Sequence, residues 1–235
     1  MLSPEEILNI IVAFLSENGI EYTAIMDDGR VNSAINEEQV KGVVERCFNQ
    51  NPVLRDGGYK YVPSNIRDWY DFGVSKDGDS DFFIPVNIKV SVLNTDNLNC
   101  KLGIYYALTG MLPSGMSNEI QWEPFCQALH RDMNTKTDGD YYFLVANKKD
   151  NKDFFWTSLK QLKAIIPNGN NLPFQANWSV NRERVQRSHV DACRFILSAF
   201  KESVYKRCRI KDVFDEYLMD FLQDDGGEDF YGVGC

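Results

Sequence analysis

The chain has 235 residues, 43% of them apolar and 13% aromatic, which suits one large domain with a substantial core. Its net charge of −9 argues against a general nucleic-acid-binding protein. No apolar run approaches the length of a membrane span, and the N-terminus does not resemble a signal peptide. Six scattered cysteines without a CxxC pair and only two histidines argue against a zinc site and predict free thiols in the cytoplasm.

The first predicted element is a helix over residues 3–19. Ser3 is the expected N-cap, Pro4 the first helical residue, Glu6 the capping-box partner and Gly19 the stop. Its apolar residues follow a single helical stripe: Ile7, Leu8, Ile11, Phe14 and Leu15. Short strands are expected within residues 20–35, a second helix over 36–48, and then a loop up to residue 68.

The rest of the chain predicts a hairpin over residues 71–89 and further strands at 141–146, 154–157 and 173–178. Residues 101–133 look mixed, with a helix near 119–133. Helices are expected at 189–205 and 211–222. This order predicts an α/β (α+β) fold, in which a central mixed β-sheet has flanking helices.

Charge is distributed unevenly near the C-terminus. Residues 182–211 contain nine Lys/Arg and three Asp/Glu, whereas residues 212–235 contain eight Asp/Glu and no Lys/Arg. Such asymmetry can mark a basic working face beside an acidic tail. It is equally typical of two solvated helical faces.

The hairpin carries the most informative chemistry. Asn87 and Lys89 share a strand face, and a turn centred near Gly78 and Asp79 places Asp71 roughly opposite Asn87. Side chains at opposite positions have Cβ atoms ~5 Å apart, so Asp71 and Asn87 can reach one metal ion with Lys89 beside it. Magnesium needs few protein oxygens when a phosphate supplies others. From these residues alone, an ordinary polar hairpin is the stronger interpretation.

An upstream acid could join this site. The helix over 36–48 contains Glu37, Glu38 and Glu45, and Glu45 lies within an apolar set, so it is the one expected to face protein. An exposed helix-surface Glu45 is an equal alternative. The acidic turn at residues 77–81 does not fit a calcium loop, because Phe82 stands at the position that requires glycine.

The ordered set resembles the PD-(D/E)xK nuclease superfamily, and within it the EcoRV-like type II restriction endonucleases. Tyr70-Asp71-Phe72 stands where the family has Pro-Asp, and Asn87-Ile88-Lys89 stands where it has Asp/Glu-x-Lys. The segment at 43–48 resembles the upstream helix with its acid, here Glu45, and the segments at 165–167 and 174–178 resemble the strand before the recognition loop. Asn87 departs from the family pattern by offering a neutral oxygen.

The resemblance implies a restriction-endonuclease-like core and a magnesium-dependent homodimer that cuts double-stranded DNA at a short palindrome. Asp71, Asn87 and Glu45 would bind Mg²⁺, and Lys89 would stabilise the scissile phosphate or the attacking hydroxide. It implies two DNA-reading loops, whose candidate residues suit base edges and phosphates: Asn65, Arg67, Asn181, Arg182, Arg184, Gln186 and Arg187. A solvated charged loop is the alternative at 179–187. Residues 206–211 supply further phosphate-contact candidates.

The expected organisation is a single nuclease domain over 1–235. The first helix and residues 20–35 are candidates for dimerisation, 36–178 for the catalytic core, 179–211 for DNA recognition and 212–235 for an acidic segment. A cognate DNA methyltransferase in the same host is the expected companion, without a stable complex. Two other functions stay open: a non-catalytic DNA-binding protein with a decayed site, and a repair or recombination nuclease of the same fold.

Overall fold

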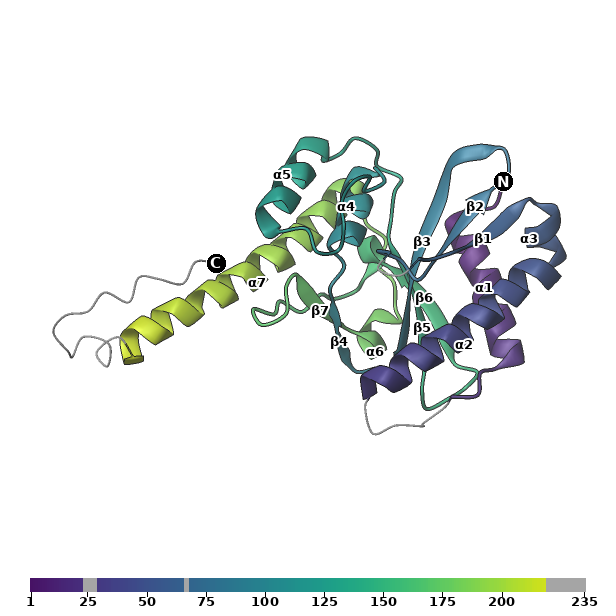
Figure 1. Cartoon of the computed structure of the whole chain (residues 1–235), viewed down its shortest axis with the longest axis horizontal. Helices are drawn as coiled ribbons and strands as arrows, with labels where there is room; N and C mark the ends of the chain where they lie inside the picture. The colour runs from purple at the N-terminus through teal and green to yellow at the C-terminus, as the bar shows by residue number, and fades with distance from the viewer. Residues whose placement is uncertain (23–28, 66–67, 219–235) are drawn as a thin grey trace.

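A five-stranded mixed sheet runs through the middle of the molecule (Figure 1). The computed structural model describes residues 1–22, 29–65 and 68–218. The strands lie side by side in the following order: β1 (Tyr59–Pro63), β2 (Phe72–Lys76), β3 (Asp79–Ser91), β5 (Tyr142–Asn147) and β6 (Phe154–Ser158). Only the β3–β5 pair is parallel. The predicted central mixed sheet with flanking helices is therefore confirmed.

Three helices cover one face of this sheet: α1 (Pro4–Asn18), α2 (Gly29–Gln50) and α3 (Pro52–Asp56). Strand β3 turns its even-numbered side chains toward them, from Ile84 to Val90, where they join an apolar core. The alternation of side chains along a strand then places the odd-numbered Asn87 and Lys89 on the opposite face.

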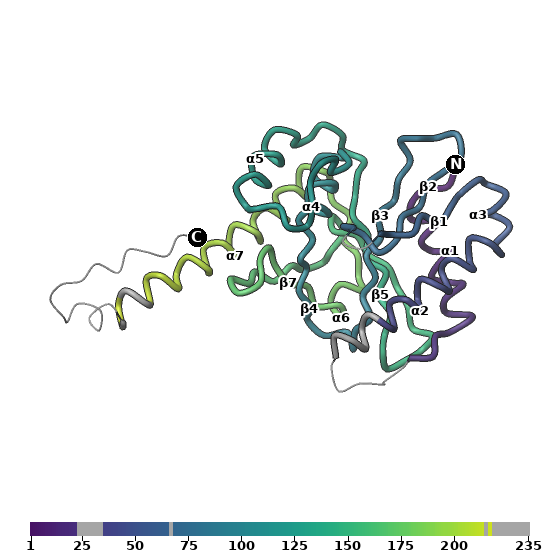
Figure 2. Tube along the Cα trace, in the orientation of Figure 1, coloured from purple at the N-terminus to yellow at the C-terminus, as the bar shows by residue number. Residues whose placement is uncertain are grey.

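On the opposite side of the sheet lie α4 (Lys101–Thr109), α5 (Trp122–Asp132), which packs against α4, and the long helix α7 (His189–Leu218). A small second sheet pairs β4 (Thr95–Leu98) with β7 (Phe174–Asn177), and η1 (Leu159–Gln161) and α6 (Trp178–Asn181) complete this side. Its core is rich in aromatic side chains, including Tyr141, Phe143 and Trp178. The C-terminal half of α7 extends beyond the body of the molecule (Figure 2).

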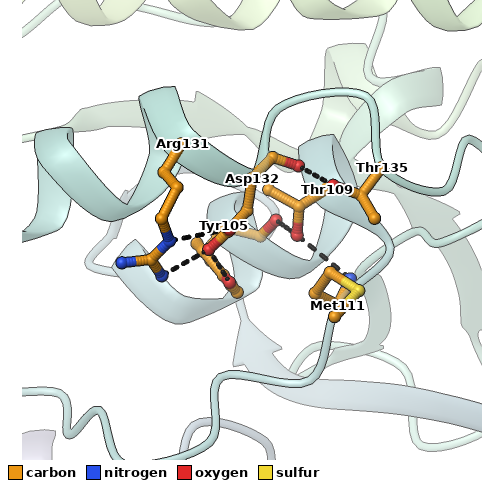
Figure 3. Close-up of polar contacts among 6 residues, drawn as sticks. All are labelled: Tyr105, Thr109, Met111, Arg131, Asp132 and Thr135. Atoms are coloured by element: carbon orange, nitrogen blue, oxygen red, sulfur yellow. Dashed lines mark hydrogen bonds and ion pairs between the residues drawn. The ribbon is translucent and has the colours of Figure 1, made fainter.

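A polar cluster fixes α4 against α5 (Figure 3). The Tyr105 hydroxyl donates a 2.6 Å hydrogen bond to Asp132, and Arg131 donates two more to the same carboxylate. These hydrogen bonds hold the pKa of Asp132 below its ordinary value. The cluster therefore joins the middle of α4 to the C-terminal end of α5.

The first helix follows the sequence closely. Ser3 accepts a hydrogen bond from the Glu6 backbone, Glu6 reaches back to the Ser3 backbone, and Gly19 caps the C-terminus at φ +68°. The strands predicted at 141–146, 154–157 and 173–178 are also present, as β5, β6 and β7. The α5 helix lies within the range predicted near 119–133.

Other predictions were wrong. The strands expected in 20–35 are replaced over 29–35 by α2, while residues 23–28 lie outside the described part of the chain. Helix α4 was missed because its residues from Leu102 to Thr109 are all buried, which removes the polar face that reveals a surface helix. The helices expected at 189–205 and 211–222 form one helix, α7, since no Gly or Pro interrupts 206–211. Helix α3 and strand β1 replace part of the expected loop.

The β2–β3 hairpin contains a bulge close to its tip. Ser75 pairs with Phe83, but the next residue, Lys76, pairs with Asp79. Residues 80–82 therefore have no counterparts on β2, and the turn itself is Asp77-Gly78, with Gly78 at φ +76°. Because the bulge absorbs the difference in strand length near the tip, a turn predicted around residue 79 still leads to the pairing observed at the far end of the hairpin.

Two composition-based predictions also meet the structure. The five cysteines in the described part of the chain are free, as expected: Cys47, Cys100, Cys126, Cys193 and Cys208. Among the helices in that part, none combines the length and apolar character needed to cross a lipid bilayer.

Candidate functional site

The hairpin brings Asp71, Asn87 and Lys89 together as its sequence predicts. Phe72 pairs with Val86, so Asp71, the residue just before β2, stands opposite Asn87. The Asp71 backbone N–H donates to the Val86 carbonyl at 2.8 Å, which continues the pairing to this point. Lys89 lies two residues beyond Asn87 and therefore on the same face.

The Asp71 carboxylate is held by the neighbouring strand. Its Oδ2 accepts a 2.6 Å hydrogen bond from the Ile88 backbone N–H. Burial raises the pKa of Asp71, while this hydrogen bond and the charges of Lys89 and Lys41 lower it. One carboxylate oxygen thus orients the side chain, and the other stays available for a ligand.

Asn87 has a buried acceptor without a partner. Its Oδ1 is inaccessible to solvent and accepts no hydrogen bond from the described residues. Burial strongly raises the pKa of Tyr141, and a contact between Asn87 and the Tyr141 hydroxyl opposes this rise. The same hydroxyl donates a hydrogen bond to the Trp69 carbonyl at 2.6 Å. Because a buried polar atom without a partner costs free energy, Oδ1 is a position where a ligand would be stabilising.

Asn87 and Lys89 line a cavity of about 180 Å³ between the main sheet and the α4 side. Its wall also includes Trp69, Cys100 and Tyr141. Further amide side chains stand around it: Asn97, Asn99 and Asn118. Asp71 is not part of this wall. Its negative charge raises the pKa of Tyr141, a residue that does line the cavity. The cavity is therefore polar, and its lining also contains one carboxylate residue, Asp68.

Among the acids of α2, Glu37 is half-buried, whereas the expected auxiliary acid, Glu45, is exposed. Burial raises the pKa of Glu37 to about 7, and the charge of Asp71 raises it further, whereas Lys89, Lys41 and Lys148 lower it. A negative charge on Asp71 opposes ionisation of Glu37. Glu37 is therefore within electrostatic reach of both Asp71 and Lys89.

Glu45 is exposed and lines clefts with Tyr61 on the β1 side of α2. Eight helical residues separate it from Glu37, which corresponds to ~12 Å along the axis. The expectation that Glu45 faces protein is therefore wrong, while its role as an auxiliary metal ligand stays a prediction. A signal in the sequence could have identified Glu37, because it precedes the buried Val40 and Val44 by three and seven residues and so continues their stripe.

The oxygen donors at this site fit a hard divalent cation such as Mg²⁺. Asp71 offers a carboxylate oxygen and Asn87 offers the unpaired Oδ1, while Glu37, on α2, interacts electrostatically with Asp71. Within the described ranges, no three His, Cys, Asp or Glu side chains gather closely enough to bind a metal by themselves. Magnesium keeps several waters and commonly shares substrate phosphate oxygens, so a small protein ligand set is sufficient.

The segment at 179–187, whose side chains were expected to contact DNA, is packed against the edge of the main sheet. Asn181 is completely buried, and its amide bonds the Ala164 backbone twice and the Asn177 carbonyl once. This contradicts a DNA contact for Asn181, because the side chain has no accessible surface.

The neighbouring basic residues are engaged with the protein as well. Arg182 forms a two-pronged ion pair with Asp153 at 2.9 and 2.7 Å. Arg184 stacks on Trp156, with its guanidinium 3.6 Å from the ring centre. Arg187 donates to the Lys160 and Leu162 carbonyls and lies over Phe195. The side chains of Arg182, Arg184 and Arg187 therefore cover the β6 edge and η1.

Two further candidates retain exposed polar groups. Gln186 is exposed and accepts a hydrogen bond from Gln161 at 3.4 Å. Asn65 is exposed, and its backbone N–H donates to Asp68 at 2.6 Å. Arg67 lies outside the described residues. DNA contacts by Asn65 and Gln186 thus stay predictions.

Comparison with known proteins adds no assignment. No protein-family model matches the chain, and no curated protein matches it.

Proposed function

We propose that this chain is a magnesium-dependent DNA endonuclease, and more narrowly a type II restriction endonuclease that acts as a homodimer on a short palindromic sequence. The observation that carries the proposal is the unpaired Oδ1 of Asn87, buried opposite Asp71 and two residues before Lys89. The resemblance of this hairpin to the PD-(D/E)xK motif gives that atom its interpretation as a metal ligand. A companion DNA methyltransferase in the host is part of the same proposal.

The proposed roles follow from the chemistry of each side chain. Asp71, Asn87 and Glu37 would hold the cation through oxygen atoms, and Mg²⁺ would supply Lewis-acid polarisation of the phosphate. Lys89 would place its ammonium beside the scissile phosphate, where it stabilises the negative charge that develops during attack. Within the described residues, Lys89 makes no hydrogen bond or ion pair that would compete with this role.

Glu37 has a second proposed role. A pKa of about 7 lets this carboxylate accept a proton near neutral pH, which suits a general base for an attacking water. Its position near both Asp71 and Lys89 is compatible with either ligation or proton transfer. The pH dependence of DNA cleavage would distinguish Glu37 from the more exposed Glu45 in this role.

The experiment that tests the proposal is digestion of a large linear DNA of known sequence. The purified chain is incubated with DNA in Mg²⁺ and in EDTA, with Lys89→Ala protein prepared in parallel. We expect discrete fragments only for the wild-type chain in Mg²⁺, and sequencing of the fragment ends would give the recognition site and the cut position. Cleavage that persists in the Lys89→Ala preparation would remove the site assignment.

One observation favours a second candidate, a DNA-binding protein without catalysis. Asn87 supplies a neutral oxygen where the family has a carboxylate, and the described residues contain no three-membered acidic cluster. DNA binding without cleavage in Mg²⁺, Mn²⁺ or Co²⁺ would support this candidate over the enzyme. In contrast, cutting of branched or damaged DNA without sequence preference would indicate a repair nuclease.

A further inference from the structure

A second cavity, of about 290 Å³, lies next to the candidate site and has no role in the function proposed above. Its polar lining comes from four separate parts of the chain: Asn99, Lys101, Asn118, Asn170, Asn171 and Arg207. Two of these, Asn99 and Asn118, also line the cavity that contains Asn87 and Lys89. The two cavities therefore share a wall.

The charge of this lining is opposite to that of the chain. The net charge of the protein is −9, but the cavity is lined by two cations, Lys101 and Arg207, and among described residues by no Asp or Glu. The remaining polar groups are amides, which can donate hydrogen bonds to an anion. A cationic cavity in an acidic protein is the arrangement expected for an anionic ligand.

Lys101 is held in place by its surroundings. Its ammonium donates to the Ile120 carbonyl and lies 4.3 Å from the centre of the Trp122 ring. Trp122 is itself packed against Phe125 and Phe200, so the ring is a fixed support. Lys101 is also the first residue of α4, whose N-terminus has no side-chain cap and so leaves backbone N–H groups available.

Arg207 faces Lys101 across the cavity from a loop-and-helix unit that is also fixed. The 168–171 loop bonds α7 through the Asn168 backbone and Ser203 at 2.9 Å, and Arg207 donates to the Asn170 carbonyl at 3.3 Å. A Cβ atom at Gly169 would lie 2.7 Å from the Arg207 backbone nitrogen, so only glycine permits this approach. The loop and Arg207 are therefore organised before any ligand binds.

From these observations we propose that the second cavity binds a backbone phosphate of the DNA strand, adjacent to the phosphate that Lys89 contacts. This inference rests on the proposed nuclease function, since it requires a polyanion that spans both cavities. Lys101 and Arg207 supply the charge, and the α4 N-terminus and the surrounding amides supply hydrogen-bond donors. The phosphate subsite would fix the register of the strand relative to Asp71 and Lys89.

The test measures binding of a fluorescent 30-base-pair duplex in EDTA, across a series of salt concentrations. Arg207→Ala removes one phosphate contact, so affinity should fall several-fold and the slope of log K against log salt should decrease in magnitude by about 0.9. Arg46→Ala is the matched control, because Arg46 is an exposed arginine on α2 that lines neither cavity. We expect this control to bind at least threefold more tightly than Arg207→Ala.

A second variant guards against a folding defect in Arg207→Ala. Asn171→Asp is nearly isosteric at an exposed residue and introduces a negative charge into the cavity. It should weaken DNA binding as strongly as Arg207→Ala. Asn49→Asp adds the same charge on α2, outside both cavities, and should have little effect.

The outcomes separate this inference from the proposed function. If the wild-type chain cuts DNA and both cavity variants bind like their controls, the phosphate subsite is overturned and the nuclease stands. If the wild-type chain neither binds nor cuts DNA, the proposed function fails, and the subsite fails with it. Inorganic phosphate at millimolar concentration is a further probe, because binding of free phosphate without binding of duplex DNA would also overturn the subsite as stated.

Discussion

Two asparagines that were both candidates for the functional site differ in how the fold uses their amide groups. Asn87 and Asn181 were both expected to contact nucleic acid or its metal ion. The amide of Asn181 makes three hydrogen bonds to backbone groups and is fully buried, whereas Oδ1 of Asn87 is buried without a partner from the described residues. The first residue uses its hydrogen-bonding capacity to fold the chain, and the second keeps an acceptor unused beside a cavity.

The same contrast extends to the cations around each asparagine. Arg182 and Arg187 are engaged by Asp153 and by backbone carbonyls, while Lys89 has no such partner in the described part of the structure. Residue type alone therefore does not identify a working surface. The hairpin combines an unsatisfied buried acceptor on Asn87 with a lysine on the same strand face, at the wall of a cavity where a ligand could satisfy that acceptor.

The largest expected effect comes from Lys89→Ala. Removing the ammonium from the site should lower the cleavage rate by at least ~10³-fold, as for loss of other groups that stabilise transition-state charge. DNA affinity in EDTA should change by less than about threefold. Rates from single-turnover cleavage provide the measurement. Lys60→Ala, which removes an exposed lysine paired with Asp77 on the sheet edge, is the control and should cleave normally.

Glu37→Gln should reduce cleavage ~10²-fold and remove a pH dependence that Glu45→Gln leaves intact. Because the pKa of Glu37 is raised to about 7, the carboxylate is neutral below that pH, and wild-type cleavage should rise between pH 6 and 8. Equal pH profiles for Glu37→Gln and the wild-type chain would contradict the assignment of this acid.

The raised pKa of Glu37 also predicts a stability change. The folded chain retains this proton when the unfolded chain has lost it, so the contribution to stability present at pH 4.5 declines as the pH rises toward 7. A glutamine at position 37 is neutral at every pH, so the Glu37→Gln variant does not show this decline in stability. Thermal unfolding should therefore show Glu37→Gln gaining in Tm relative to the wild-type chain between pH 5 and pH 8.

Asn181→Ala should act on stability and leave DNA binding unchanged. The substitution removes three hydrogen bonds and leaves backbone groups of Ala164 without their partner, which should cost about 2 kcal/mol of unfolding free energy. Urea denaturation measures this loss. Val180→Ala, at an exposed neighbouring residue, should change stability far less. A fully stable Asn181→Ala protein with weakened DNA binding would show that Asn181 contributes to DNA binding and not to the stability of the fold.

The smallest effect is expected for Arg182→Ala. Its ion pair with Asp153 is partly exposed, so the loss of stability should be about 0.5–1 kcal/mol and should shrink at high salt. The salt dependence of DNA binding should match that of the wild-type chain. A clear decrease in its slope would show that Arg182 leaves Asp153 to contact a phosphate.

The sequence predicted the β2–β3 hairpin because its pairing is local and its alternation is strict. Asp71 and Asn87 are sixteen residues apart in sequence, and their pairing follows from a single turn region. Helix α1 was equally predictable, since its capping residues signal both ends.

The remaining parts depend on tertiary context. A fully buried helix such as α4 has no amphipathic pattern, and an edge strand such as β1, which ends at Pro63, resembles a loop. The choice between Glu37 and Glu45 required knowing where α2 crosses the sheet. The 179–187 segment looked suited to base contacts because the sequence does not show Asp153 or the η1 carbonyls that engage it.

The bulge near the hairpin tip makes the alignment of the distant site sensitive to insertions and deletions. Residues 80–82 absorb the offset between the Lys76–Asp79 pair and the Ser75–Phe83 pair, so they fix which residue of β3 faces Asp71. Loss of one pairing position would rotate Asn87 and Lys89 toward the apolar face beneath α2 and bring hydrophobic neighbours into the cavity. An exposed hairpin tip usually tolerates changes in length. The length of this tip, however, sets the strand register at a site at the other end of the strand.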